Sequence, residues 1–398
     1  MRYYCALICI ILALFFGACS NTDSPFLGAP EAVATPASGD VAGPRFSQGE
    51  GGELVLSWME IGASGTTLNY ATLIAGEFSA VRPVVTEPRM FVNWADLPSV
   101  LPLGENRLIA HWLRYSADKT YSYDVVVSQS FDGGTTWDDA ITAHTDGTPT
   151  EHGFVSMVPA PDGVSLLWLD GRNTPDGSMT LRSAVITPDG QLTKEQEVDE
   201  SVCDCCQTDM AITARGAVAV YRDRTAAEIR DISISRVENE RWLPGRRVHA
   251  DNWTIPGCPV NGPSIVARGE QVAVAWFTAA SDLPVVKVVR SADSGVSFTD
   301  PLEIASGAIN GYVGLAALEQ GSLAVSWVAK NEAGDNVLRV RAVSGSGEPG
   351  PVQDVATIHQ LRVFPQLAFV DDHLWFAWTD DDTDQRYLAA ARIPVTLP

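Results

Sequence analysis

An alternating apolar stretch that ends in an aromatic residue recurs seven times along this 398-residue chain, at nearly constant spacing. The clearest copy is Gln-Val-Ala-Val-Ala-Trp at residues 271–276. The aromatic residues that end the copies are Trp58, Trp112, Trp168, Tyr221, Trp276, Trp327 and Trp378. A fixed period of about 50 residues is typical of repeat architectures. Apolar residues in alternation, separated by Gly-rich gaps, indicate that each repeat is built from strands.

A ring of small sheets is the architecture that suits such repeats, because one four-stranded sheet leaves both of its faces uncovered. Each repeat divides into a short inner strand, the repeated stretch, a third strand and a weaker outer strand. The chain ends after the seventh third strand, so we expect residues 32–35 to supply the missing outer strand and close the ring. We therefore predict an all-β, seven-bladed β-propeller with four-stranded antiparallel blades. A six-bladed ring with one decorated repeat is the alternative.

The first residues have the pattern of an export signal. Arg2 precedes an apolar stretch at residues 6–16 that is too short to span a membrane comfortably. The following Phe-Gly-Ala-Cys resembles a bacterial lipobox, which implies a signal peptide at residues 1–18 and a lipid on Cys19. In the lipoprotein sorting rule, an aspartate directly after the lipidated cysteine is a retention signal. Ser20 occupies that position here, which favours the outer membrane. An ordinary cleaved signal with an incidental cysteine is the alternative.

The rest of the chain divides into a tether and a folded domain. Residues 19–43 are rich in Ala, Pro, Ser, Thr and Gly and predict a flexible tether, and residues 44–398 predict the propeller. The formal net charge is −22, which argues against nucleic acid and anionic membrane surfaces as partners. We expect an envelope protein, facing the periplasm or the cell surface, that is monomeric and attached to the membrane through Cys19.

Two turns between third and outer strands share the pattern Ser-x-Asp-x-Gly-x-x-aromatic. The copies consist of Ser130, Asp132, Gly134 and Trp137, and of Ser291, Asp293, Gly295 and Phe298. We expect Ser and Asp to cap backbone N–H groups, Gly to take a positive φ, and the aromatic ring to pack between strands. The pattern resembles the Asp-box of sialidase-like (BNR-repeat) propellers, and the resemblance covers residues 45–393. Such a motif identifies a fold and leaves the chemistry open.

Unusual polar and aromatic residues concentrate in the loops that open on the other face of a propeller. These candidate ligand-binding residues are Asn93, Trp94, His152, Asp170, Arg172, Arg222, Arg224, Asn261 and Arg362, with Arg45 on the first inner strand. A scaffold does not need such residues, so they indicate a binding site at the channel mouth. Salt bridges between neighbouring blades are the alternative.

Four cysteines remain once the predicted signal peptide and the lipidated Cys19 are set aside: Cys203, Cys205, Cys206 and Cys258. An even number in an oxidising envelope favours disulfides. Cys203 or Cys206 would join Cys258 across two blades, or Cys205 and Cys206 would form a vicinal bond. A thiolate metal site with His152 or His111 as a further ligand is the alternative. The Cys-x-Cys-Cys spacing matches no common zinc motif, so we expect no metal or other cofactor.

The resemblance to sialidases implies roles for several of these residues. Sialidases hold the sugar carboxylate with arginines, whose planar guanidinium groups match it. The arginines so implied are Arg45, Arg222 or Arg224, and Arg362. The implied nucleophile, helper carboxylate and acid/base are Tyr312, Glu228 and Asp96.

Three functions follow for the predicted propeller. The first is recognition or processing of an acidic glycan at the channel mouth, as in an exo-α-sialidase-like glycoside hydrolase. The second is a non-catalytic binding or assembly factor for an envelope protein. The third is a metal or redox site built from the cysteines.

Overall fold

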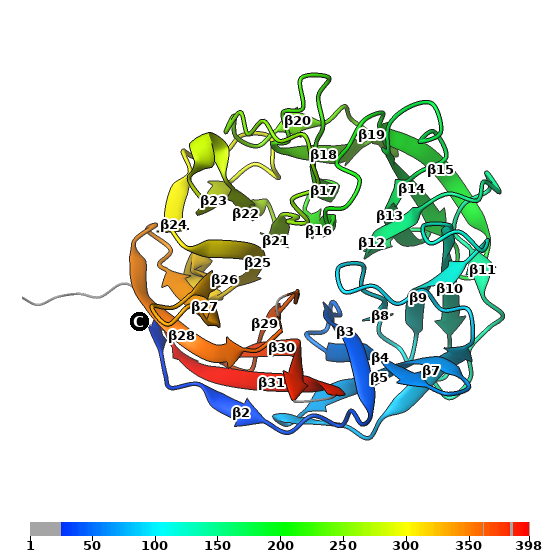
Figure 1. Cartoon of the computed structure of the whole chain (residues 1–398), viewed down its shortest axis with the longest axis horizontal. Coiled ribbons are helices and arrows are strands. Elements are labelled where there is room, and N and C mark those ends of the chain that lie inside the picture. The colour runs from blue at the N-terminus through cyan, green and yellow to red at the C-terminus, as the bar shows by residue number, and fades with distance from the viewer. Residues whose placement is uncertain (1–24, 361, 383–384, 398) are drawn as a thin grey trace, which may run out of the picture.

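The computed structural model describes residues 25–360, 362–382 and 385–397, and these form a seven-bladed β-propeller (Figure 1). The sheets follow one another around a central channel, and the six-bladed alternative is wrong. The predicted signal peptide and Cys19 lie outside the described residues. Within the described part of the chain, no helix is both long and apolar enough to cross a membrane.

Each blade begins with an inner strand at the channel and continues outward. The inner strands are β3 (Asp40–Gln48), β8 (Ser99–Pro102), β12 (His152–Ala160), β16 (Asp209–Thr213), β21 (Ser264–Arg268), β25 (Ile309–Ala317) and β29 (Gln366–Val370). The second strands are β4 (Leu54–Gly62), β9 (Leu108–Tyr115), β13 (Gly163–Asp170), β17 (Gly216–Arg222), β22 (Gln271–Thr278), β26 (Leu323–Lys330) and β30 (His373–Asp382).

The outer half of each blade is more variable than the inner half. The third strands are β5 (Gly65–Ile74), β10 (Tyr123–Ser130), β14 (Thr180–Ile186), β18 (Ile232–Glu238), β23 (Val285–Ser291), β27 (Asn336–Val343) and β31 (Gln385–Thr396). The outer strands of the first six blades are β6 (Glu77–Phe78) with β7 (Arg82–Glu87), β11 (Ile141–Thr142), β15 (Leu192–Asp199), β19 (Arg241–Trp242) with β20 (Arg246–Arg247), β24 (Leu302–Ser306) and β28 (Pro349–Ile358). Two short 3-10 turns are η1 (Ala280–Asp282) and η2 (Glu319–Gly321).

The hydrophobic core lies between consecutive blades. The aromatic residues that end the seven second-strand copies are all buried, as the repeat predicts. In one cluster, Trp168 of blade 3 joins Val125 and Val127 of blade 2. In another, Trp276 of blade 5 joins Val220 of blade 4. Each sheet therefore covers its faces with its neighbours, and burial of this apolar surface is what holds the ring together.

The N-terminal segment closes the ring, as predicted. Strands β1 (Phe26–Leu27) and β2 (Glu31–Val33) pair antiparallel with β31, and β2 lies along its outer edge in Figure 1. Residues 26–43 therefore belong to the propeller, and the prediction of a tether that extends to residue 43 is wrong. The composition of this segment suggested flexibility, but the open edge of blade 7 gives its backbone hydrogen-bonding partners. Asp40 also accepts two hydrogen bonds from Arg386, at 2.8 and 2.7 Å.

The two Asp-box-like turns have the hydrogen bonds predicted for them. Asp132 Oδ1 accepts from the backbone N–H groups of Thr135 and Thr136, at 3.0 and 2.9 Å. Ser130 Oγ accepts from the N–H of Gly134, whose φ is 80°. The second turn repeats these contacts with Asp293 and Ser291. Both turns lie on the face opposite the candidate loops, so they stabilise the fold away from any site at the channel mouth.

Candidate functional site

In the central channel, the half-buried Arg45 lies near two acids, Asp96 and Asp209. Arg45 of β3 donates from Nη1 to the carbonyl oxygen of Val155, at 2.8 Å. Burial lowers the pKa of Arg45, while the charges of Asp209 and Asp96 act in the opposite direction. These side chains line a channel cavity of about 200 Å³. Arg45 is therefore part of the channel lining, with a backbone partner of its own.

Asp96 is the most perturbed acid of this channel. Its Oδ1 accepts from the N–H of Phe154 at 2.8 Å, and its Oδ2 has no partner among the described residues. Burial raises the pKa of Asp96 to about 8, and the nearby charge of Glu151 adds to the rise. Asp96 is consequently protonated at neutral pH, the state that a general acid requires.

Three aromatic rings and one arginine gather at the channel mouth, and we call them the aromatic rim: Trp94, Tyr312, Phe364 and Arg362. Trp94 stacks on Phe364 with 5.5 Å between ring centroids, and Tyr312 meets Phe364 edge-on at 4.7 Å. The guanidinium carbon of Arg362 lies 5.6 Å from the Trp94 ring centroid. The rim thus combines apolar ring faces with a positive charge.

Backbone contacts from blades 2 and 5 hold the rim in place. Tyr312 has a φ of 55°, which is unusual for a residue with a side chain. Its N–H donates to Asn261 Oδ1 at 2.7 Å. Asn93 Oδ1 accepts from the N–H of Ala95 at 2.9 Å and so fixes the turn that carries Trp94. Asn93 and Asn261 therefore support the rim through their amide oxygens.

A cavity of about 610 Å³ opens beside the rim, between blades 7, 1 and 2. Trp94, Arg362 and Phe364 line one side of it, and Pro44, Asp381 and Arg386 are among its other lining residues. Arg386 is held by Asp40, as described above. This volume is within the range of sites that accept small ligands.

Arg222 is a brace inside the protein, which argues against its predicted role in ligand binding. The side chain is only 2% exposed. Its guanidinium donates to the backbone carbonyls of Asn261, Arg230 and Phe277 at 2.6 to 3.0 Å. It also lies 4.9 Å from the Trp253 ring centroid. Arg222 ties blade 4 to blade 5, and four of its five guanidinium N–H donors are used in these bonds.

Arg224 and Glu228 bind each other, which argues against their predicted roles too. Arg224 Nη2 lies 2.8 Å from Glu228 Oε1, and Arg230 Nη2 lies 2.8 Å from Glu228 Oε2. These two arginines lower the pKa of Glu228. The described partners of Glu228 do not include Tyr312. The predicted pairing of nucleophile and helper carboxylate is therefore not formed.

His152, Asp170 and Arg172 belong to a polar network between blades 2 and 3. Arg172 donates two hydrogen bonds of 2.7 Å to Asp170. Burial acts to raise the pKa of Asp170, but these hydrogen bonds and the charge of His152 outweigh it and lower the pKa. The His152 ring stacks on His144 at 3.8 Å between centroids. Burial works against protonation of His152, but contact with Asp146 and the charge of Asp170 outweigh it and raise its pKa. The alternative to a binding site, salt bridges between neighbouring blades, therefore explains these three residues.

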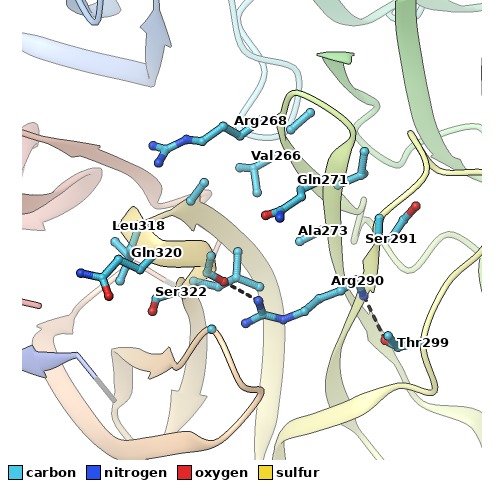
Figure 2. A pocket seen from close by; sticks show the side chains of 17 residues that line it. Val266, Arg268, Gln271, Ala273, Arg290, Ser291, Thr299, Leu318, Gln320 and Ser322 are labelled. Carbon is cyan, nitrogen blue, oxygen red and sulfur yellow. Dashed lines mark hydrogen bonds between the residues drawn. The ribbon is translucent and has the colours of Figure 1, made fainter. Parts of the chain in front are cut away.

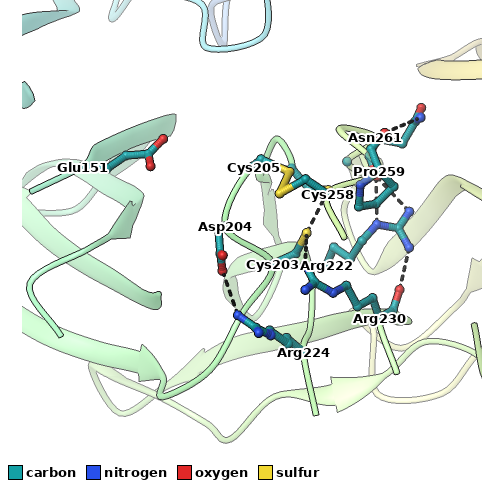
Figure 3. Close-up of a disulfide and its surroundings, with 12 residues drawn as sticks. Glu151, Cys203, Asp204, Cys205, Arg222, Arg224, Arg230, Cys258, Pro259 and Asn261 are labelled. Atoms are coloured by element: carbon teal, nitrogen blue, oxygen red, sulfur yellow. Dashed lines mark hydrogen bonds and ion pairs between the residues drawn. A yellow bond between two sulfur atoms is a disulfide. The ribbon is translucent and has the colours of Figure 1, made fainter. Parts of the chain in front are cut away.

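The cysteines form a disulfide between successive inter-blade loops, but the predicted pairings are wrong. Cys205 is joined to Cys258, with 6.1 Å between Cα atoms, whereas Cys203 and Cys206 are free thiols (Figure 3). The spacing along the chain could not distinguish three cysteines that lie within four residues of one another. His111 lies elsewhere, with its Nδ1 2.9 Å from Ser99 Oγ.

A further cavity of about 340 Å³ lies between blades 5 and 6 on the opposite face (Figure 2). Arg290 crosses it and donates to backbone carbonyls of Gly321 and, at 2.8 Å, Ser344. Its lining is mostly small side chains and turn backbone. Because Arg290, the arginine that crosses it, is used for bracing, this cavity is a weaker candidate than the rim.

The structure brings together some predicted residues and adds others. Trp94, Tyr312 and Arg362 converge, with Asn93 and Asn261 in support. Phe364 was not predicted, because an apolar residue just before an inner strand resembles a core residue. Pro365 has no backbone N–H to donate to a sheet, so the sequence does indicate that Phe364 lies outside the regular strand.

Comparisons with known proteins show the fold and no more. No family model matches the chain, and no curated protein matches its sequence. A protein of unknown function from Dyadobacter fermentans DSM 18053 has a similar structure, with a TM-score of 0.53, 14% identity, and coverage of 94% of this chain and 100% of that chain. A puromycin hydrolase has a TM-score of 0.50 at 14% identity, covering 91% of this chain and 55% of that chain. The α-L-arabinofuranosidase Arb93A from Fusarium graminearum has a TM-score of 0.49 at 11% identity, covering 93% and 98%.

Proposed function

We propose that this protein binds an acidic glycan at the aromatic rim and does not cleave it. The observation that carries the proposal is the guanidinium of Arg362, held over Trp94 at the edge of a cavity of about 610 Å³. Aromatic faces bury the apolar side of a ring-shaped ligand, and a guanidinium matches a carboxylate with two parallel hydrogen bonds. A sugar acid offers both surfaces.

Arg362 suits this role better than the other predicted arginines. Its side chain is exposed, and no described carboxylate forms an ion pair with it. Arg222 donates to backbone carbonyls, and Arg224 is paired with Glu228. Arg45 lies within the channel below, with Val155 as a partner. A carboxylate that enters from solvent therefore meets Arg362 first.

Several features argue for binding without hydrolysis. Burial raises the pKa of Tyr312, although Arg362 acts against the rise, so the phenol is a poor nucleophile. Glu228 is held by Arg224 and Arg230, so no carboxylate from that loop assists Tyr312. Asp96 is suited to donate a proton, but a lone acid does not make a retaining glycosidase.

The proposal also places the protein in the bacterial envelope. The lipobox-like residues and Cys19 would anchor it as an outer-membrane lipoprotein. The Cys205–Cys258 disulfide supports an oxidising compartment. A negative formal charge of −22 would keep the body of the protein from anionic lipid headgroups.

Calorimetric titration with sialyllactose and lactose tests the proposal, since the two sugars differ by the acidic residue. We expect binding of sialyllactose, or of a uronic acid oligosaccharide in the same assay, and much weaker binding of the neutral sugar. Arg362→Ala should weaken acidic-sugar binding by about tenfold or more, the effect of losing one charged hydrogen-bonding partner. Trp94→Ala should weaken it too. Arg268→Ala, which changes an exposed arginine on the opposite face, is the matched control.

Two outcomes would count against the proposal. Equal affinity of wild type and Arg362→Ala would remove the rim from the binding site. Turnover of a fluorogenic sialoside that Tyr312→Phe abolishes would show an enzyme in place of a binding protein. Capture of an envelope protein at the rim, with no sugar bound at millimolar concentration, would support the assembly factor instead.

A further inference from the structure

Four sulfur atoms lie together where the loop before blade 4 meets the loop before blade 5. Cys205 and Cys258 are bonded, and the Cys203 and Cys206 sulfurs are 3.3 Å apart. The sulfurs of Cys203, Cys205 and Cys258 all lie within 4.8 Å of one another. A free thiol is thus next to a disulfide and next to a second free thiol. A structural staple alone would need neither of them.

The four sulfurs run from the interior to the surface. Cys203 and Cys206 are buried, Cys205 is half-buried and Cys258 is exposed. Figure 3 shows Cys203 between the disulfide and the arginines beneath it. Solvent-borne reactants can therefore reach the cluster at Cys258, while the free thiols are shielded from direct oxidation.

The surroundings favour a thiolate at Cys203. Contact with Cys206 lowers the pKa of Cys203 against the effect of burial, and the charge of Arg222 and a hydrogen bond from Arg230 lower it further. Arg230 Nη1 donates to Cys203 Sγ at 3.2 Å. Burial raises the pKa of Cys206, so that this thiol keeps its proton. One sulfur is thus prepared as a nucleophile and its neighbour as a protonated thiol.

We propose that the four cysteines form a thiol–disulfide exchange site that passes a disulfide between the interior and the surface. The Cys203 thiolate attacks Cys205 Sγ, a Cys203–Cys205 bond forms, and the electron pair of the broken bond leaves on Cys258. Cys206 attacks Cys203 Sγ and releases Cys205 as a thiolate, while the proton of Cys206 passes to the Cys258 thiolate. The products are a buried Cys203–Cys206 disulfide and a Cys205/Cys258 dithiol, so no electrons are gained or lost.

The exposed end couples this exchange to an external reactant. The Cys205/Cys258 dithiol can reduce a disulfide of a small molecule or protein, which takes up two electrons as the Cys205–Cys258 bond re-forms. In the reverse direction, an external dithiol reduces Cys205–Cys258 and is itself oxidised. The site would serve this chemistry whether or not the aromatic rim binds a glycan.

Disulfide mapping of the purified protein after equilibration in glutathione buffers of stepped ratio tests the proposal. Acid quenching and N-ethylmaleimide would trap each state for mass spectrometry. At intermediate ratios we expect single-disulfide molecules of two kinds, with Cys205–Cys258 or with a bond to Cys203. Under oxidising conditions we expect both Cys205–Cys258 and Cys203–Cys206. Cys203→Ser should retain only Cys205–Cys258 and serves as the control.

A kinetic measurement separates exchange from a merely structural role of the arginine. Arg230→Gln should slow the migration of the disulfide at pH 6 by about threefold to tenfold and shift its pH profile upward, because the thiolate loses a cation. The variant is interpreted only if its circular dichroism spectrum and melting temperature match those of the wild-type protein. The mapping of the wild-type protein remains decisive if this variant fails to fold.

Two results would overturn the proposal. One is a protein in which Cys205–Cys258 forms alone at every ratio, with Cys203 and Cys206 still thiols in excess oxidant. The other is a stoichiometric metal ion that must be removed by a chelator before any of these cysteines reacts, which would make the cluster a thiolate metal site.

Discussion

The two sides of the channel mouth use arginine in opposite ways. On the side of blades 4 and 5, Arg222 is buried and donates to three backbone carbonyls. On the side of blades 6, 7 and 2, Arg362 is exposed and contacts the face of Trp94. Arg222 ends strand β17 and Arg362 lies in the loop before β29, and the sequence analysis predicted the same ligand-binding role for both. The partners of a guanidinium, and not its place at a channel mouth, therefore distinguish a brace from a binding group.

The largest expected effect is on stability, from Arg222→Ala. Removal of this guanidinium takes away the donors that bind three buried carbonyls, so we expect a loss of about 3–5 kcal/mol in the free energy of unfolding. Urea unfolding followed by tryptophan fluorescence measures it. A loss below about 0.5 kcal/mol, the size expected for surface substitutions, would show that Arg222 is not a brace.

Reduction of the disulfide should have the next largest effect. Cys205 and Cys258 are 53 residues apart in sequence, and we expect Cys258→Ser to cost about 2–4 kcal/mol. Wild-type protein should lose a similar amount when dithiothreitol is added to the urea titration. Identical wild-type curves with and without reductant would show that this side of the mouth does not depend on the bond.

The pH dependence of stability should reveal the channel acid. Asp96 has a pKa of about 8 when folded, against 3.8 for the unfolded reference. The folded state therefore holds a proton that the unfolded state releases, and stability should fall as pH rises from about 4 to about 8. Asp96→Asn removes this component, so its profile should be flatter in that window. Parallel profiles of wild type and variant in urea unfolding would contradict a protonated Asp96.

The smallest effect on stability is expected at the rim. Arg362→Ala should change the free energy of unfolding by less than about 0.5 kcal/mol, because the exposed side chain gives up little packing. The same urea titration that reports on Arg222→Ala measures this change. A loss comparable to that of Arg222→Ala would make both arginines braces and remove the distinction between the two sides.

The sequence predicted the scaffold well because the forces that define it are local or periodic. Buried aromatic residues such as Trp168 recur with the blade, and turns such as that of Asp132 satisfy their hydrogen bonds within a few residues. The same reasoning found Trp94 and Arg362 as members of one face, and the resemblance to sialidases added Tyr312. It also found the segment that closes the ring, although its composition suggested a tether.

The remainder depended on contacts between residues far apart in sequence. Two of the carbonyls that accept from Arg222, those of Asn261 and Phe277, belong to blade 5, and backbone partners leave no mark in residue types. Spacing could not distinguish Cys205 from its neighbours as the partner of Cys258. Phe364 resembled a core residue, because residue type alone does not distinguish an apolar side chain at a channel mouth from one inside a sheet.

Crystals soaked with sialyllactose, or with whichever acidic oligosaccharide binds most tightly in solution, would test the central claim most directly. The account predicts electron density for a sugar ring over Trp94, with its carboxylate against Arg362 and its body in the cavity of about 610 Å³. Density beside Arg224 and Glu228, or in the cavity on the opposite face, would contradict it. So would an empty rim in crystals held at a concentration that saturates binding in solution.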